Sequence, residues 1–396
     1  MRAAGIPQGT LAAGQERSAG IEAPRGMEED SGRVKISDIR VKHIDRELDP
    51  PFDAAWDPVP RTSFEATLVF VETDTGLTGV GSGDTMAGFA AHAHHFIGED
   101  PLRMVRHVET IESINFHAGR FWPLEVALWD IVGQACGQSV ATLFGGTAER
   151  LPVYASCGDL KSPDARAESA IALRAEGFRA MKIRIDPRRA DEGVAAVRAV
   201  RDAVGSDLDI MVDLNQAWRP AGDITRSIDV PAARLIAERL LELDVLWLEE
   251  PLKGDDRQGL VDLRRSTGMR VAGGEMAQTF ADSLALLQAD AYDVYQSDVV
   301  LAAGMHRSRQ LAELARMRNR SFTPHTWSNG IGLLANLHVA AGVGAGPYLE
   351  YPYDPPGWTP ERRDFMLAEP LRIDGDGCLP VPQAPGLGIV LDPELR

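Results

Sequence analysis

Short apolar runs alternate with helical patterns along the chain from residue 151 to residue 350. Each run has the length of one strand that is buried on both faces, as in a parallel sheet. The runs stand at residues 151–156, 180–185, 210–215, 245–250, 271–275, 294–299, 321–324 and 347–350. After each of the first seven runs, apolar residues recur at helical spacing. Strand and helix repeated in this order predict an α/β fold, a (β/α)7β barrel rather than an open sheet.

The preceding part of the chain, residues 34–145, follows a different order. Apolar residues scattered through residues 34–48 predict a first strand. Residues 65–72 and 77–81 predict two more strands, joined by a hairpin turn at residues 74–76. Helical patterns fill the remainder. This part of the sequence therefore predicts an α+β domain, with a three-stranded antiparallel sheet followed by helices.

These patterns divide the chain into domains. Residues 1–33 are rich in Ala, Gly, Ser and charge and lack the apolar core of a signal peptide. We interpret them as a disordered N-terminal extension, or as an upstream start with Met27 as the true initiator. Residues 34–145 form the first predicted domain and residues 146–354 the predicted barrel. The Pro/Gly-rich tail, residues 355–396, is expected to pack back on the first domain.

Composition and charge narrow the classes of partner. The net charge of −17 argues against binding to nucleic acid and to anionic membranes. No apolar run approaches the roughly 20 residues of a membrane helix. The three cysteines, Cys136, Cys157 and Cys378, are few and scattered, which predicts reduced thiols in a cytoplasmic protein. We expect a small-molecule substrate and a homo-oligomer.

Three of the predicted barrel strands end in an acid. Asp213, Glu249 and Glu275 each follow a short apolar run, and the carboxyl ends of successive parallel strands meet at one end of a barrel. Carboxylate oxygens are hard ligands, and a cluster of them without Cys or His suits Mg²⁺. One such acid would often be a helix cap or a surface charge, whereas three in a row predict a metal site.

The other strand ends carry further ionisable residues. Lys182 and Arg184 stand two apart and so lie on the same side of the second strand, and Asp298 and His325 end the sixth and seventh. His325 is a candidate base because an imidazole titrates near neutral pH, and Asp298 would hold its other ring nitrogen. Such a base would remove the proton α to a carboxylate, and Mg²⁺ would stabilise the resulting enediolate.

The roles of the remaining polar residues stay open. Arg184 cannot be an ordinary base, so it would either lower the pKa of Lys182 or clamp a substrate oxygen. Glu350, at the end of the eighth strand, would hydrogen-bond the enediolate if it stays protonated. Candidate substrate contacts are Asn215, Trp56 and Trp327, of which the two tryptophans would equally serve as packing. The histidines at positions 92, 94 and 95 are a weaker metal candidate, because no acid accompanies them.

The chain resembles the enolase superfamily, and within it the mandelate racemase subgroup, over nearly its whole length after about residue 34. The resemblance rests on Ala127-Leu128-Trp129-Asp130, Gly145-Gly146, Lys182-x-Arg184, Asp213-x-Asn215, Trp247-x-Glu249-Glu250-Pro251, Gly274-Glu275, Asp298 and His325-x-Trp327. It implies a modified TIM barrel with an N-terminal capping domain, and a loop around Trp56 that closes over the substrate. It further implies Mg²⁺ ligation by the three acids, an Asp298–His325 base dyad and an electrophilic acid at the position that Glu350 matches.

One position departs from that subgroup. The racemase carries Lys-x-Lys on the second strand, with the second Lys as a base, whereas this chain has Arg184 there. With one competent base, His325 would take the α-proton and return it to a departing β-hydroxyl, which is dehydration of an acid sugar by a lyase. The alternative is an isomerase, a racemase, epimerase or cycloisomerase of a sugar acid or lactone, with Lys182 as a second base for racemisation. A metal-dependent hydrolase would usually need His ligands or paired metals, and a non-catalytic metal-binding scaffold is the remaining class.

Overall fold

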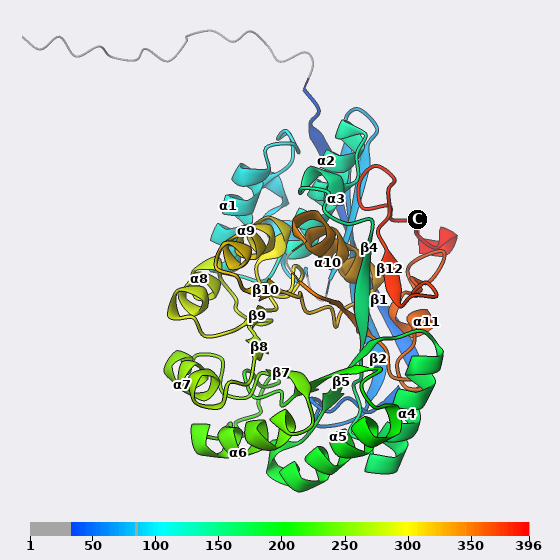
Figure 1. Cartoon of the computed structure of the whole chain (residues 1–396). Coiled ribbons are helices and arrows are strands. Elements are labelled where there is room, and N and C mark those ends of the chain that lie inside the picture. Colours follow the sequence, from blue (N-terminus) through cyan, green and yellow to red (C-terminus); the bar gives the residue numbers. More distant parts are fainter. Residues whose placement is uncertain (1–32, 84–85, 345, 396) are drawn as a thin grey trace, which may run out of the picture. The chain divides into compact units, whose positions relative to one another are not determined.

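The computed structural model describes residues 33–83, 86–344 and 346–395, and Val34–Arg396 form one unit (Figure 1). The predicted extension at residues 1–33 therefore lies outside the described residues except for Arg33. Within the described part of the chain, no helix is long and apolar enough to cross a membrane.

The first sheet is antiparallel, with the order β1 (Ile36–Phe52), β2 (Arg61–Thr73) and β3 (Thr78–Gly83). The prediction of three strands is confirmed, but β1 runs past residue 48, where the sequence predicted its end. Phe52 pairs with Arg61 after a register shift that begins at Glu47. Such an irregularity accommodates the two prolines at positions 50 and 51, which lack the N–H group of a regular ladder.

Helices of the first domain cover this sheet. After two 3-10 turns, η1 (Phe89–Ala91) and η2 (Ala93–His95), come α1 (Met104–Asn115), α2 (Trp122–Cys136) and α3 (Val140–Leu143). Helix α2 begins with Pro123 in its first turn and ends at Gly137, whose φ of 63° is left-handed. The backbones of α2 and β3 are in close contact. A Cβ atom at Gly79 or Gly81 of β3 would collide with the backbone of α2.

The barrel strands pair in the order β10-β9-β8-β7-β6-β5-β4-β11, and every neighbouring pair is parallel. They are β4 (Arg150–Ser156), β5 (Ala180–Arg184), β6 (Asp209–Asp213), β7 (Val245–Glu249), β8 (Val271–Gly273), β9 (Val294–Tyr295), β10 (Ser321–Phe322) and β11 (Leu349–Pro352). One α-helix follows each of the first seven: α4 (Pro163–Ala175), α5 (Ala190–Val204), α6 (Val230–Leu241), α7 (Arg257–Thr267), α8 (Phe280–Ala289), α9 (Gly304–Met317) and α10 (Gly330–Val343). In Figure 1 these helices surround the curled sheet, so the predicted (β/α)7β barrel with an α+β capping domain is confirmed.

An apolar layer fills the barrel below the site. It consists of Tyr154, Ala180, Met211, Trp247, Ala272 and Val294. Side chains two positions apart on a strand share a face. Lys182, Asp213 and Glu249 each stand two positions after a member of this layer, on β5, β6 and β7. The charged layer therefore lies above the apolar one, at the carboxyl ends of the strands.

The C-terminal tail, which includes α11 (Pro360–Arg363), β12 (Cys378–Pro380) and η4 (Pro393–Leu395), bonds to both parts of the chain. Strand β12 pairs antiparallel with β4 of the barrel. Farther along, the Leu387 N–H donates to Asp130 Oδ1 (2.8 Å), and the Val140 N–H donates to the Gly386 carbonyl (2.9 Å). The domain boundaries at residues 145 and 354 stay predictions.

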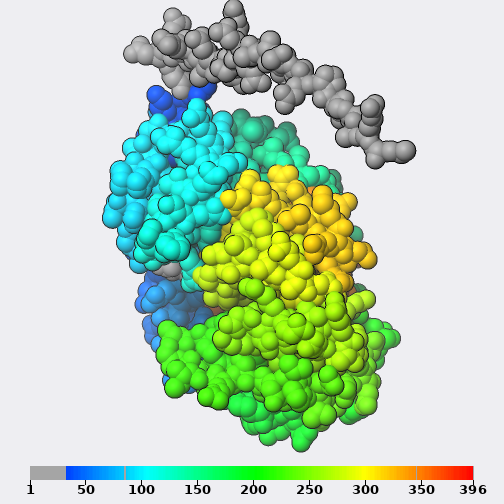
Figure 2. All heavy atoms as spheres, turned by 90° about the vertical axis from the view of Figure 1, so that its left-hand side faces the viewer, coloured from blue at the N-terminus to red at the C-terminus, as the bar shows by residue number. Residues whose placement is uncertain are grey.

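The capping helices also contact the barrel directly. Figure 2 shows α1 and its neighbours, in cyan, against the yellow helix α9. Arg307 of α9 donates to both carboxylate oxygens of Glu112 of α1, at 2.8 and 2.9 Å.

Arg166 on α4 is the buried cation that anchors the loop after β4. Its side chain is fully buried and donates to both carboxylate oxygens of the equally buried Asp354, at 3.1 and 3.3 Å. Removal of one partner of a buried ion pair costs about 3–5 kcal/mol. Because Lys161 stays beside Asp354 Oδ1 (2.6 Å), Arg166→Ala is expected to lower the free energy of unfolding by up to about this amount. Arg174→Ala, on the same helix, removes an exposed ion pair with Asp207 and is expected to cost about 0–1 kcal/mol. Urea unfolding of both variants measures the difference, and equal losses would contradict this role of Arg166.

Candidate active site

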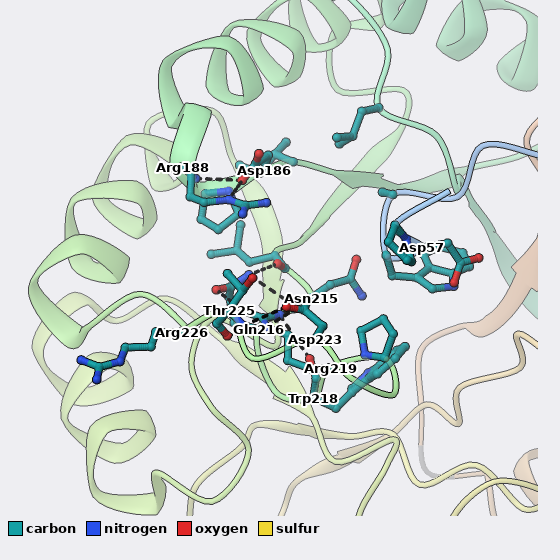
Figure 3. A pocket seen from close by; sticks show the side chains of 18 residues that line it. Asp57, Asp186, Arg188, Asn215, Gln216, Trp218, Arg219, Asp223, Thr225 and Arg226 are labelled. Atoms are coloured by element: carbon teal, nitrogen blue, oxygen red, sulfur yellow. Dashed lines mark hydrogen bonds and ion pairs between the residues drawn. The ribbon is translucent and has the colours of Figure 1, made fainter. Parts of the chain in front are cut away.

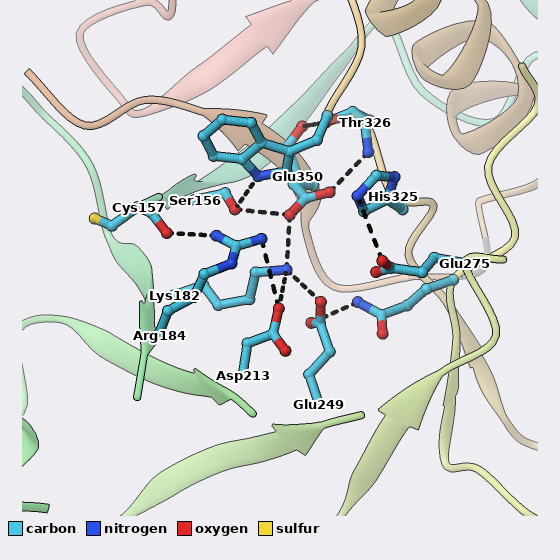
Figure 4. A network of polar contacts seen from close by, with 12 residues as sticks. Ser156, Cys157, Lys182, Arg184, Asp213, Glu249, Glu275, His325, Thr326 and Glu350 are labelled. Carbon is cyan, nitrogen blue, oxygen red and sulfur yellow. Dashed lines mark hydrogen bonds and ion pairs between the residues drawn. The ribbon is translucent and has the colours of Figure 1, made fainter. Parts of the chain in front are cut away.

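Lys182 lies at the centre of the acid cluster (Figure 4). Its ammonium forms ion pairs with Glu249 Oε1, with Glu350 Oε1 (2.7 Å) and with Asp213 Oδ2 (3.5 Å), and all four side chains are fully buried. Burial lowers the pKa of Lys182, but Glu249, Glu350 and Asp213 outweigh burial and raise it above the ordinary value. The nearby Arg184 charge lowers it only slightly by comparison, so in this arrangement Arg184 does not turn Lys182 into a base.

Arg184 is held in place by polar groups and by two aromatic rings. Its guanidinium donates to the Cys157 carbonyl and to Asn215 Oδ1 (3.1 Å), and NH2 lies 3.5 Å from Asp213 Oδ2. The rings of Trp56 and Trp327 lie 4.3 and 5.1 Å from its central carbon, a distance at which a guanidinium is attracted to the faces of aromatic rings. The three side chains predicted to contact substrate thus surround Arg184, which fits a fixed clamp.

His325 and Asp298 form a hydrogen-bonded pair on the other side of the cluster. His325 Nδ1 lies 2.9 Å from Asp298 Oδ2, and its Nε2 lies 3.8 Å from Glu275 Oε1. Asp298 Oδ1 in turn accepts from the Val300 N–H (2.8 Å) and from Asn336 Nδ2 (3.2 Å). Burial lowers the pKa of His325, but Glu275, Glu350 and Asp298 raise it to about 9.

Glu350 is held as an acceptor. Its two oxygens accept from Ser156 Oγ and from the Thr326 N–H, both at 2.7 Å, in addition to the Lys182 ammonium. Burial raises the pKa of Glu350, but Lys182, His325 and Arg184 outweigh it and lower the pKa to about 2. The carboxyl is therefore ionised here. From the sequence we expected Glu350 to hydrogen-bond the enediolate only if it stays protonated. Three cations face it in the structure, so this condition is not met.

The predicted metal ligands Asp213, Glu249 and Glu275 supply only carboxylate oxygens, which suit Mg²⁺. Glu275 Oε1 accepts from Trp218 Nε1 (2.7 Å), and its buried Oε2 has no partner. Burial raises the pKa of Glu249 to about 7 and also raises that of Glu275. A cation at these oxygens would relieve both the unpaired atom and the crowded charge, so the donor set fits a divalent metal.

The position of Lys182 bears on that fit. Among the described residues, no group of three or more His, Cys, Asp or Glu side chains is arranged to hold a metal ion. The Lys182 ammonium forms ion pairs with both Asp213 and Glu249, so these two carboxylates already share a cation of the chain itself. The histidines at positions 92, 94 and 95 likewise form no such group. His94 and His95 lie in the 3-10 turn η2 and His92 lies between η1 and η2, so they do not stand on the predicted helix.

A cavity of about 410 Å³ opens above the cluster, with Arg184, Glu275 and His325 at its floor and Arg61 and Arg120 from the capping domain in its wall. A second cavity of about 320 Å³ (Figure 3) adjoins it. The two cavities share three lining residues: Trp56, Asn215 and Trp218.

Several polar residues of the site were not predicted: Ser156, Trp218, Gln296, Thr326 and Asn336. Gln296 donates to Glu249 Oε2 (2.7 Å), and Trp327 Nε1 donates to Ser156 Oγ (2.8 Å). The alternation of side chains along a strand could have indicated two of them. Ser156 stands two positions after Tyr154, and Gln296 stands two positions before Asp298, so each shares a face with that residue in the predicted strand. The others lie in loops or on helix α10, where no strand period applies.

Relatives of known activity match most of the chain. D-galactarolactone cycloisomerase of Agrobacterium fabrum is 28% identical over 91% of this chain and 97% of its own. 3,6-anhydro-alpha-L-galactonate cycloisomerase of Streptomyces coelicolor is 31% identical over 83% and 90%. Arabinonate dehydratase of Saccharolobus solfataricus is 28% identical over 68% of each chain.

A solved structure and a family match agree with these relatives. The structure of a racemase from Streptomyces coelicolor with bound magnesium has a TM-score of 0.77 and 27% identity, and the match covers 91% of this chain and 98% of that one. Residues 165–395 match the family described as Enolase C-terminal domain-like. The barrel, the acids at its strand ends and these matches lead to one conclusion: the chain belongs to the enolase superfamily, in its mandelate racemase-like group.

Proposed function

We propose that this protein is a Mg²⁺-dependent lyase that removes the proton α to the carboxylate of a sugar acid and expels a β-hydroxyl group. The observation that supports this most directly is the His325–Asp298 pair, whose Nε2 faces the acid cluster across from Lys182 and Arg184. A base on one side of a cavity and fixed cations on the other suit an anionic substrate that is deprotonated from one face.

Asp213, Glu249 and Glu275 are the residues that would hold the metal. When bound there, Mg²⁺ supplies positive charge that stabilises the anion formed by deprotonation. The ammonium of Lys182 would have to leave Asp213 and Glu249, because it occupies their shared oxygens. It would then be free to pair with the substrate carboxylate, which gives Lys182 a binding role in place of a basic one.

The proton moves between substrate and His325 alone. The neutral form of His325 takes the α-proton at Nε2, while Asp298 holds Nδ1–H and stabilises the imidazolium. Because the pKa of His325 is raised to about 9, the neutral form is a minor fraction near pH 7 and grows as the pH rises toward that value. The electron pair of the broken C–H bond forms the enediolate, which then expels the β-hydroxyl as the C–O bond breaks. His325 returns the proton to that oxygen, so water leaves and the enol product becomes a 2-keto-3-deoxy acid. Arg184 holds a substrate oxygen, and Trp56 and Trp327 exclude water around it.

Cycloisomerisation is the second candidate function. The two cycloisomerases reported above match a larger share of this chain than the dehydratase does. The same base would serve. After His325 takes the α-proton, the bond between the β-carbon and the ring oxygen breaks in place of the bond to a hydroxyl, so the ring opens and the leaving oxygen stays in the molecule. The proton is then returned to the β-carbon, and no water is lost.

The two functions differ in their products. The full chain with MgCl₂ would be incubated in D₂O with a set of sugar acids and their lactones and followed by ¹H NMR. Dehydration is expected to yield a 2-keto-3-deoxy acid that reacts with semicarbazide. Cycloisomerisation would also end in a 2-keto acid, so the mass of the product decides. A product that is lighter than its substrate by one water supports dehydration, whereas a product that has gained deuterium and lost no water would favour cycloisomerisation. Turnover with EDTA equal to that with Mg²⁺ would contradict both.

A further inference from the structure

The loop between β9 and α9 carries Asp298 and is bound by the capping helix α2. Trp122 Nε1 at the start of α2 donates to the Ala302 carbonyl at 2.8 Å, in a contact that is fully buried. Arg120 NH1 donates to the neighbouring Leu301 carbonyl (3.2 Å). One turn later in α2, Glu125 Oε1 accepts from the His306 N–H (2.7 Å) at the start of α9. Three side chains of one short segment thus contact consecutive parts of this loop.

These contacts continue without a break to the proposed base. The Ala302 N–H donates to the Asp298 carbonyl (3.0 Å), and the Val300 N–H donates to Asp298 Oδ1 (2.8 Å). Asp298 Oδ2 then lies 2.9 Å from His325 Nδ1. Because the loop is a tight turn closed on Asp298 itself, a shift of Ala302 moves the carboxylate that orients the imidazole.

The fit between loop and indole is close. Gly304 has a φ of 75°, a conformation that favours glycine. A Cβ atom at this position would lie 2.6 Å from Trp122 Cε3 and would collide with Glu125 Oε2. Trp122 itself is 3% exposed. The end of the loop therefore has room only for a residue without a side chain. This close packing fixes the distance between the loop and α2.

We propose that Trp122 is a positioning residue for the His325–Asp298 pair, so that a capping helix helps to set the orientation of the base in the barrel. This inference rests on the proposed function of His325. The barrel side contributes one side-chain support, since Asn336 of α10 donates to Asp298 Oδ1 and accepts from the Val299 N–H (both 3.2 Å). A role of Trp122 in stability alone would lower the melting temperature and leave the rate of a folded variant unchanged.

Trp122→Phe removes the indole N–H and keeps a buried ring. It is expected to lower kcat roughly 10-fold and to leave KM within about two-fold, because misorientation of a base affects the chemical step more than substrate binding. The matched control is Gln134→Leu on the same helix, whose amide donates to the Thr78 carbonyl and to Asp130 Oδ2, both at 2.9 Å, away from the loop between β9 and α9. This control is expected to retain kcat within about two-fold. Equal kcat for the two variants would overturn the inference.

Gly304→Ala disturbs the contact between the loop and Trp122 from the loop side. It tests the inference if Trp122→Phe does not fold. Its kcat is expected to fall with KM unchanged, and a wild-type kcat would count against the inference. Hydrogen–deuterium exchange of the peptide covering residues 297–304 gives a readout that needs no turnover. Faster exchange in Trp122→Phe than in Gln134→Leu supports the inference. This result would stand even if the wild type turned over no sugar acid, which would contradict only the proposed function. Equal exchange would then overturn the inference as well.

Discussion

His325→Asn is expected to lower kcat by roughly 10²–10⁴-fold, the range that a general acid–base group contributes. Asparagine can still hydrogen-bond to Asp298, but it has no nitrogen that takes up and returns a proton. Lys182 and Arg184 cannot replace His325 as the base, because the surrounding acids hold both side chains as cations. Steady-state assays with the acid that the wild type consumes measure the loss.

His117→Asn makes the same substitution on the surface of the capping domain, where the side chain is exposed, and is expected to retain full activity. Isothermal titration with Mg²⁺ checks that His325→Asn leaves the acid cluster intact, since His325 is not a proposed ligand. A His325→Asn variant that keeps more than about a tenth of wild-type kcat would rule out His325 as the acid–base group.

Glu249→Gln is expected to weaken Mg²⁺ binding by roughly 100-fold or more, because the loss of an outer partner of a ligand already costs 10–100-fold. The Glu249 carboxylate is fully buried and accepts from both Lys182 and Gln296. The amide removes the negative charge at the point where the metal would displace the ammonium. Titration of metal-stripped protein with Mg²⁺ measures the change, and activity at low Mg²⁺ should fall in parallel.

Glu250→Gln is the control, one position along the chain. Burial raises the pKa of Glu250 well above its usual range, and both of its buried oxygens lack a partner in the structure. Burial thus favours the uncharged carboxyl at this position, and the amide keeps its shape without adding charge. Unchanged Mg²⁺ affinity in Glu249→Gln, or a loss of similar size in Glu250→Gln, would contradict the assignment of Glu249.

Sequence patterns predicted the acid cluster because it depends on two regular features, the period of a strand and the common direction of parallel strands. Asp213, Glu249 and Lys182 follow from these alone. Strands β9 and β10 were predicted to be longer than they are, since each contains only two residues. Beyond Tyr295 the chain leaves the ladder and turns so that Asp298 can bond to its own loop.

Contacts between distant loops carried no periodic signal. The enclosure of Arg184 joins Trp56 from the first domain to Trp327 from the loop after β10, and neither sequence position indicates that they meet around one guanidinium. The ionised state of Glu350 was equally hidden, because it depends on how near three cations approach it. Charge balance in a buried cluster is a property of distances, which a single sequence does not contain.

The ammonium of Lys182 stabilises the folded protein when no metal is bound. Asp213, Glu249 and Glu350 carry negative charge into a buried space, and without a cation they would repel one another. Lys182 is a counterion that the chain itself provides. We therefore expect the barrel to stay folded when a chelator removes the metal, unlike small domains that unfold under the same treatment.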